Sequence, residues 1–61
     1  MRGLTTTFRG HDIKVTRTER GQTRVQIWKN GVLRDSHAAA FETFDDAVNY
    51  AKFIILNSTF D

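Results

Sequence analysis

Five cationic, amide or aromatic side chains between positions 14 and 34 could together bind a polyanion. They are Lys14, Arg24, Gln26, Trp28 and Arg34. Lys and Arg bind phosphates, the Gln amide can form two hydrogen bonds with a base edge, and an indole provides a surface for stacking. Side chains alternate between the two faces of a β-strand, so Arg24, Gln26 and Trp28 would share one face. This pattern favours a binding surface over a reaction centre.

An ordinary solvated sheet face is the alternative interpretation of the same residues. Trp28 would then rest against Val32 and the aliphatic stems of Arg24 and Arg34. Asp12 falls on the same face and reduces its positive charge. A protein-binding surface is a third possibility, and the sequence leaves all three open.

Two segments place a histidine beside an acid, and neither predicts catalysis. In Asp35-Ser36-His37 the serine and the histidine are adjacent, so on a strand they would point to opposite faces. His11 would face Phe8 on the inner side of the sheet, as a partly buried structural residue. Asp45-Asp46 suits the start of a helix. We therefore predict a protein that is not an enzyme, with no metal site, no cofactor and no small-molecule substrate.

The length and composition limit the architecture to one domain over residues 1–61. The chain has a mass of 7.0 kDa, a formal net charge of +2 and no cysteine, which excludes a disulfide framework. A chain this short without disulfides or metal often gains stability from a second copy. Its longest apolar run, residues 53–56, is too short to span a bilayer, and no secretory segment is evident. We expect a cytoplasmic protein without membrane contact.

Three glycine-containing turns, each separating short β-rich stretches, organise the first two thirds of the chain. They predict an antiparallel meander of four strands, at about 3–9, 11–18, 22–29 and 32–38. A two-residue loop at Arg9-Gly10 pairs Phe8 with His11. A three-residue loop at 19–21 with a glycine bulge pairs Val15 with Val25 and Ile13 with Ile27.

A similar bulge at residues 29–31 would pair Ile27 with Leu33 and Trp28 with Val32. The expected inner face then carries seven apolar residues: Leu4, Phe8, Ile13, Val15, Val25, Ile27 and Leu33. The expected outer face carries mostly polar ones: Thr5, Thr7, Lys14, Thr16, Arg24, Gln26, Trp28, Val32 and Arg34. Arg17 would lie at the rim of the sheet with its head group in water.

One helix is predicted over residues 44–57, because Thr43 and Asp46 have the spacing of a capping box. Its apolar stripe would cover the inner face of the sheet and consists of Phe44, Ala47, Val48, Ala51, Ile54 and Ile55. The fold class is therefore α+β, with the order ββββα and one C-terminal helix on one face of the sheet.

The opposite side of this helix is also partly apolar. Phe53 and Leu56 lie there, and Phe60 would join them if the helix continued. Exposed apolar groups of this size are typical of an interface, so these three residues predict a homodimer or a protein partner. The alternative is that the tail from Asn57 folds back and buries Phe60 locally.

From Gln22 to Ile55 the chain has a strand, an Asn-Gly turn, a strand and then Phe41-Glu42-Thr43-Phe44-Asp45-Asp46-Ala47 opening a helix. This order resembles the AP2-like DNA-binding domains at the N-terminus of tyrosine integrases, which place a three-stranded sheet in the major groove. The resemblance implies that Arg24, Gln26 and Trp28, with Lys14 and Arg34, face DNA. Here a further leading strand and residues 35–40 depart from that pattern. The order ββββα is also similar to a single Pur-type repeat, which binds single-stranded nucleic acid as paired repeats.

Two functions are therefore expected. The first is a small module that binds DNA or RNA through the outer face of its sheet, as a homodimer. The second is a small homodimeric protein-interaction module of the phage or mobile-element accessory type, acting through the outer helix face. A bacterial or phage origin is expected for either.

Overall fold

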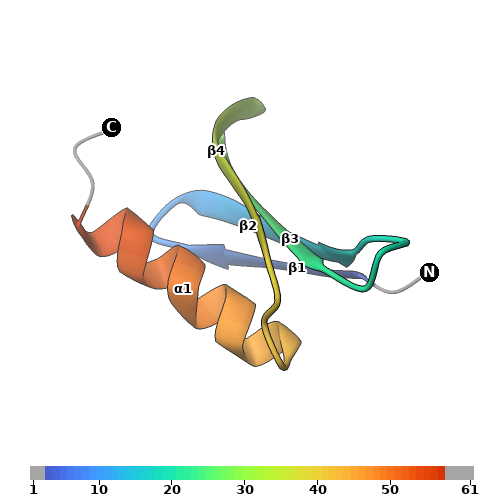
Figure 1. The fold of residues 1–61 in the computed structure, drawn as a ribbon. Coiled ribbons are helices and arrows are strands. Elements are labelled where there is room, and N and C mark those ends of the chain that lie inside the picture. The colour runs from blue at the N-terminus through green and yellow to red at the C-terminus, as the bar shows by residue number, and fades with distance from the viewer. Residues whose placement is uncertain (1–2, 58–61) are drawn as a thin grey trace.

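Four strands and one helix make up the part of the chain that the computed structural model describes, residues 3–57. The strands are β1 (Gly3–Phe8), β2 (His11–Arg17), β3 (Thr23–Lys29) and β4 (Val32–Ala39), and the helix is α1 (Phe44–Asn57). The sheet has the order β1-β2-β3-β4, every neighbouring pair is antiparallel, and α1 lies on one side of it (Figure 1). The predicted α+β fold with the order ββββα is confirmed.

The first two hairpins have the predicted registers. Arg9 and Gly10 form a two-residue turn with φ angles of 52° and 82°, and Phe8 pairs with His11. The positive φ angles match the twist that antiparallel strands require of a short turn. In the second hairpin the Thr18 N–H donates to the Gln22 carbonyl at 2.7 Å. Its glycine bulge aligns Val15 with Val25 and Ile13 with Ile27, so the apolar residues of β2 and β3 share one face.

The third hairpin differs from the prediction. Asn30 and Gly31, with φ angles of 54° and 79°, form a two-residue turn, because both residue types accept this conformation. Trp28 therefore pairs with Leu33, and Leu33 lies on the outer face and is 44% exposed. The expected positions of Leu33 on the inner face and Val32 on the outer face are both wrong.

An irregularity between Ile27 and Trp28 restores the register in the rest of β4. Trp28 pairs with Leu33, but Ile27 pairs with Asp35, so Arg34 is the extra residue of a β-bulge. Beyond the bulge His37 pairs with Val25 and therefore lies on the inner side. The bulge was expected at the turn and lies inside β4.

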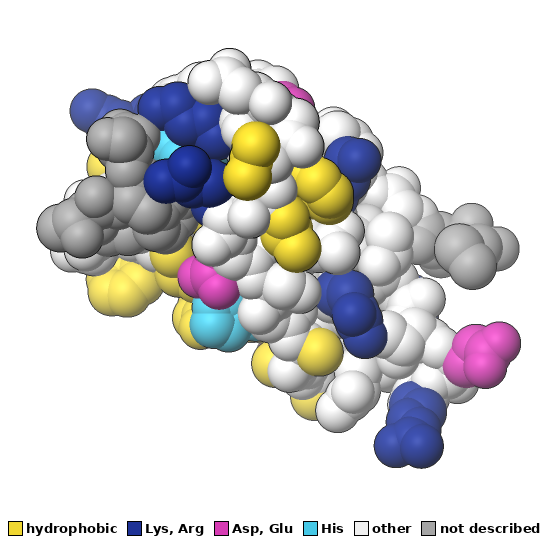
Figure 2. Space-filling view, turned by 90° about the horizontal axis from the view of Figure 1, so that it is seen from above, with side chains coloured by type: hydrophobic (Ala, Val, Ile, Leu, Met, Phe, Trp, Pro, Cys, Tyr) yellow, Lys and Arg dark blue, Asp and Glu magenta, His cyan; other side chains and the backbone are white. Residues whose placement is uncertain are grey.

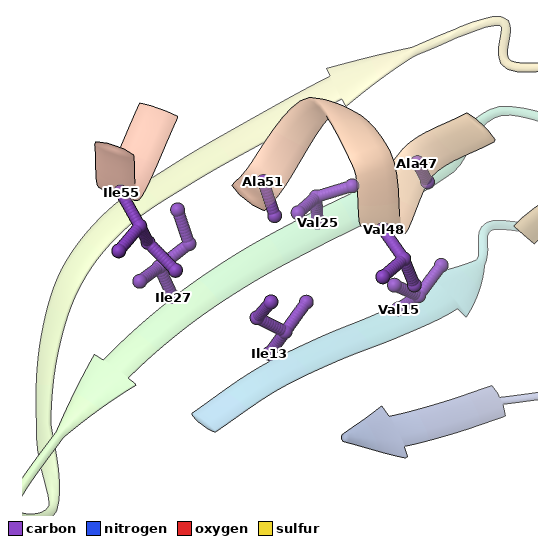
Figure 3. Packing of buried hydrophobic residues seen from close by; sticks show 8 residues of the cluster. All are labelled: Ile13, Val15, Val25, Ile27, Ala47, Val48, Ala51 and Ile55. Carbon is purple, nitrogen blue, oxygen red and sulfur yellow. The ribbon is translucent and has the colours of Figure 1, made fainter. Parts of the chain in front are cut away.

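The core is the space between α1 and the two central strands, as Figure 3 shows. Its side chains are at most 9% exposed and come from β2, β3 and α1: Ile13, Val15, Val25, Ile27, Ala47, Val48, Ala51 and Ile55. Phe44 and Ile54 are partly buried against this cluster, which confirms the predicted helix stripe. Transfer of this apolar surface out of water is the main stabilising contribution to the fold.

The start of α1 is capped by the predicted residue. The Asp46 N–H donates to Thr43 Oγ1 at 3.1 Å, and Asp45 and Asp46 lie in the first turn, at the positive end of the helix dipole. Within residues 3–57, α1 falls short of the length and hydropathy that a membrane-spanning helix needs.

Candidate nucleic-acid interface

The face of the sheet opposite α1, called the outer face below, brings together four of the five residues singled out as binding residues. Cross-strand partners share a face, and the register places Lys14 opposite Gln26 and Thr16 opposite Arg24. Trp28 alternates with Gln26 and Arg24 along β3. The outer face consists of Thr5, Thr7, Asp12, Lys14, Thr16, Arg24, Gln26, Trp28, Leu33, Ser36 and Ala38.

Lys14 and Trp28 are in direct contact on this face. The Lys14 ammonium lies 5.0 Å from the centroid of the Trp28 ring, within the range of a cation–π interaction. Lys14 and Arg24 are exposed, whereas Gln26 and Trp28 are half-buried. The outer face thus combines a flat aromatic group with side chains that can bind phosphate and a side chain that can bind a base edge.

Trp28 has a cross-strand partner on each side. Leu33 lies opposite it on β4 and Asp12 lies opposite it on β2. The indole Nε1 is buried and has no hydrogen-bond acceptor among residues 3–57. An unsatisfied donor of this kind costs about 1–3 kcal/mol, so the ring is retained there at some cost in stability.

Arg34, the fifth of these residues, is exposed at the bulge of β4. It follows Leu33, which is a member of the outer face, and it precedes Asp35, whose cross-strand partner Ile27 is buried in the core. Arg34 therefore lies at the bulge, next in sequence to Leu33, the cross-strand partner of Trp28. The bulge directs the neighbouring acid to the other side of the sheet.

Asp35 and His37 form a pair on the inner side, which the sequence reasoning did not predict. His37 Nε2 and Asp35 Oδ2 are 3.1 Å apart, and the His37 ring meets the edge of Tyr50 on α1 at 5.3 Å between centroids. Their spacing in the sequence could have indicated this pair, because residues two apart on a strand share a face. Ser36 is paired with Gln26 on the outer face, so it lies on the other side of β4 from His37.

His11 lies on the inner side of the sheet, as predicted, and is buried rather than partly buried. It is 3% exposed, pairs with Phe8, and has its Nδ1 3.3 Å from the Arg9 carbonyl oxygen. In residues 3–57 no three His, Asp or Glu side chains come together in a way that could hold a metal ion.

A second surface lies on α1, where Phe53 and Leu56 are 62% and 57% exposed. These are the two described residues of the predicted apolar interface, and Phe60, the third, lies outside the described residues. On the flank of α1 nearest β1, the Lys52 ammonium lies 5.4 Å from the centroid of the Phe8 ring.

Figure 2 shows the molecule from above the view of Figure 1. Dark blue Lys and Arg side chains occupy several separate places on this side, with yellow hydrophobic side chains between them and few magenta acidic ones. The surface is thus mixed basic and apolar rather than uniformly basic.

Comparison with protein-family models, with curated proteins and with solved structures finds no match to the chain. The resemblance to AP2-like domains and to Pur-type repeats therefore stays a prediction.

Proposed function

We propose that this protein binds nucleic acid through the outer face of its sheet. The observation that carries the proposal is the contact between the Lys14 ammonium and the Trp28 ring, with Gln26 and Arg24 beside them on the same face. Proteins that bind single-stranded nucleic acid combine cationic side chains with aromatic rings on which the bases stack.

Each residue has a distinct role in this proposal. Trp28 stacks on a base, Lys14, Arg24 and Arg34 bind phosphates, and Gln26 contacts a base edge. Lys14 can contact a phosphate while it stays near the indole, because it is exposed and its four-carbon stem is flexible.

Three cations and the acid Asp12 give the surface a moderate charge. We therefore expect micromolar affinity that weakens with salt, as for contacts made mainly with phosphates. Stacking on Trp28 requires an unpaired base, so single strands should bind more tightly than duplexes of the same length.

A fluorescence-anisotropy titration with labelled single-stranded and duplex oligonucleotides of DNA and RNA tests this function. The variant Arg24→Gln with Trp28→Leu should lose binding to every oligonucleotide and keep its far-ultraviolet circular dichroism. The matched control is Arg20→Gln, which removes a cation from the exposed turn between β2 and β3 and should bind as the wild type does. Absence of salt-sensitive binding by the wild-type protein at 50 mM salt would refute the proposal.

Protein interaction through α1 is a second candidate function, favoured by the exposure of Phe53 and Leu56. The occupant of that face would be a second copy or another protein. Phe53→Glu should abolish this association, whereas Val32→Glu, at a residue of similar exposure (55%) on β4, should not. Size-exclusion chromatography with light scattering measures the self-association, and it separates this function from nucleic-acid binding.

A further inference from the structure

The two edges of the sheet differ in how they are protected. β1 and β4 are the edge strands, and an open edge presents backbone N–H and C=O groups that can pair with another strand. Proteins block such edges with charges, proline or bulges. β4 has a bulge at the adjacent charged residues Arg34 and Asp35, whereas β1, with the sequence GLTTTF, has no charge, no proline and a regular register with β2.

The geometry of the first hairpin determines which groups of β1 face outward. In a two-residue turn the flanking residues, here Phe8 and His11, form a hydrogen-bonded pair, and such pairs alternate along the ladder. Thr6 and Leu4 are therefore also bonded to β2. The N–H and C=O groups of Thr5 and Thr7 point toward the open edge.

The inner side of β1 is only partly covered. α1 packs chiefly on β2 and β3, and the buried side chains labelled in Figure 3 come from α1 and those two strands. Leu4 is 38% exposed, and Thr6 and Phe8 are half-buried. An apolar strip thus runs along the open edge, on the same side as the helix.

We propose that β1 pairs antiparallel with β1 of a second copy, around a two-fold axis at Thr6. In this register Leu4 lies opposite Phe8 of the second copy, and Thr5 lies opposite its Thr7. The outward backbone groups of Thr5 and Thr7 then form hydrogen bonds with their counterparts. Because the strand has no charge, no like charges meet, and the partly exposed Leu4 packs against an aromatic ring.

A second copy fits this edge better than an unrelated peptide, because the strand matches itself in this register. The pairing also places β1 in the middle of an eight-stranded sheet, which enlarges the core of a chain of only 61 residues. The outer faces of both copies become continuous, with Lys14 level with Asp12 of the second copy. The two Lys14 residues are therefore three strand spacings apart across the sheet, about 14 Å, and offset by two residues along it. This interface is distinct from the Phe53 face and does not depend on nucleic-acid binding.

Sedimentation velocity without nucleic acid, over a range of protein concentrations, tests the proposal. The wild type should have twice the 7.0 kDa mass of one chain. Thr6→Lys places two ammonium groups at the two-fold axis, so it should raise the dimer dissociation constant at least tenfold. Thr5→Pro removes an outward N–H that β2 does not use, and should also weaken the dimer.

Two controls keep the test decisive. Thr6→Val should preserve or tighten the dimer, and circular dichroism should show that both weakening variants remain folded. Phe53→Glu should leave this dimer intact. A monomeric wild type at millimolar concentration overturns the proposal, and so does a dimer that resists Thr6→Lys and Thr5→Pro but is lost in Phe53→Glu.

Discussion

The Lys14 ammonium lies over the Trp28 ring, with 5.0 Å between the nitrogen and the ring centroid, although the two residues come from different strands and are not directly opposite. Lys14 is paired with Gln26 and Trp28 is paired with Asp12. The contact is therefore diagonal across the outer face, and it brings the cation and the aromatic ring together there.

Trp28 should contribute to binding through its ring rather than its N–H. Trp28→Leu removes the stacking surface and should weaken single-strand binding by about 1–3 kcal/mol, or about 5- to 150-fold. Trp28→Phe keeps an aromatic face and should retain most of the affinity. It also removes the buried unsatisfied Nε1, so its free energy of unfolding should stay close to the wild-type value. Anisotropy titrations and urea denaturation measure both effects, and equal losses of affinity in the two variants would contradict a stacking role.

The salt dependence of binding should report how many cations contact phosphate. With Lys14, Arg24 and Arg34 engaged, the slope of log K against log salt should be about −2 for a single strand. Arg24→Gln should reduce its magnitude by about 0.7, whereas Arg20→Gln should leave it unchanged. Titrations between 50 and 300 mM salt measure the slope. A slope near zero would mean that the outer face does not bind the phosphate backbone.

Thr43 should stabilise the fold through its cap on α1. Thr43→Ala removes the acceptor for the Asp46 N–H and should cost about 1 kcal/mol. For a chain of this size that corresponds to a fall in Tm of about 4–8 °C. Thr43→Ser keeps the hydroxyl and should remain near the wild type in thermal denaturation followed by circular dichroism. Equal Tm values for the alanine and serine variants would show that the cap is not significant.

Ile27 should be among the least replaceable residues of the core. It is fully buried, and Ile27→Ala should destabilise the protein by about 2–5 kcal/mol. A chain of 61 residues has a total stability of about 3–9 kcal/mol at typical values per residue, so the variant should lose a large part of its free energy of unfolding. Val32→Ala removes an exposed side chain and should change stability by about 0.5 kcal/mol or less. Denaturant titrations measure the free energy of unfolding of both variants. Equal values for Ile27→Ala and Val32→Ala would contradict the position of Ile27 in the core.

The sequence was informative wherever the hydrophobic pattern and the turn chemistry agreed. The glycine bulge before Gln22 and the two-residue turn at Arg9-Gly10 both align apolar residues on one face, and both registers are confirmed. The helix boundaries follow from Thr43 and the apolar stripe for the same reason, and α1 spans the predicted residues.

The sequence was misleading where these two signals disagreed. Pairing Leu33 with Ile27 would have buried one more apolar side chain, but Asn30-Gly31 favours a two-residue turn that sends Leu33 outward. The bulge that compensates lies at Arg34, where no glycine indicates it. The Asp35–His37 pair depends on that bulge, so its contact with Tyr50 could not be predicted either.

The bulge in β4 also determines the charge of the outer face. In a regular strand after the turn, Asp35 would lie opposite Gln26 and His37 opposite Arg24, both on the outer face. The one extra residue at Arg34 moves both to the helix side and leaves Ser36 and Ala38 opposite the binding residues. A regular strand that keeps Arg34 would therefore bring a carboxylate on to the outer face without any substitution, whereas deletion of Arg34 would leave Asp35 opposite Ile27. The way the strand accommodates one extra residue, rather than a change of residue type, thus decides whether the outer face carries Asp35.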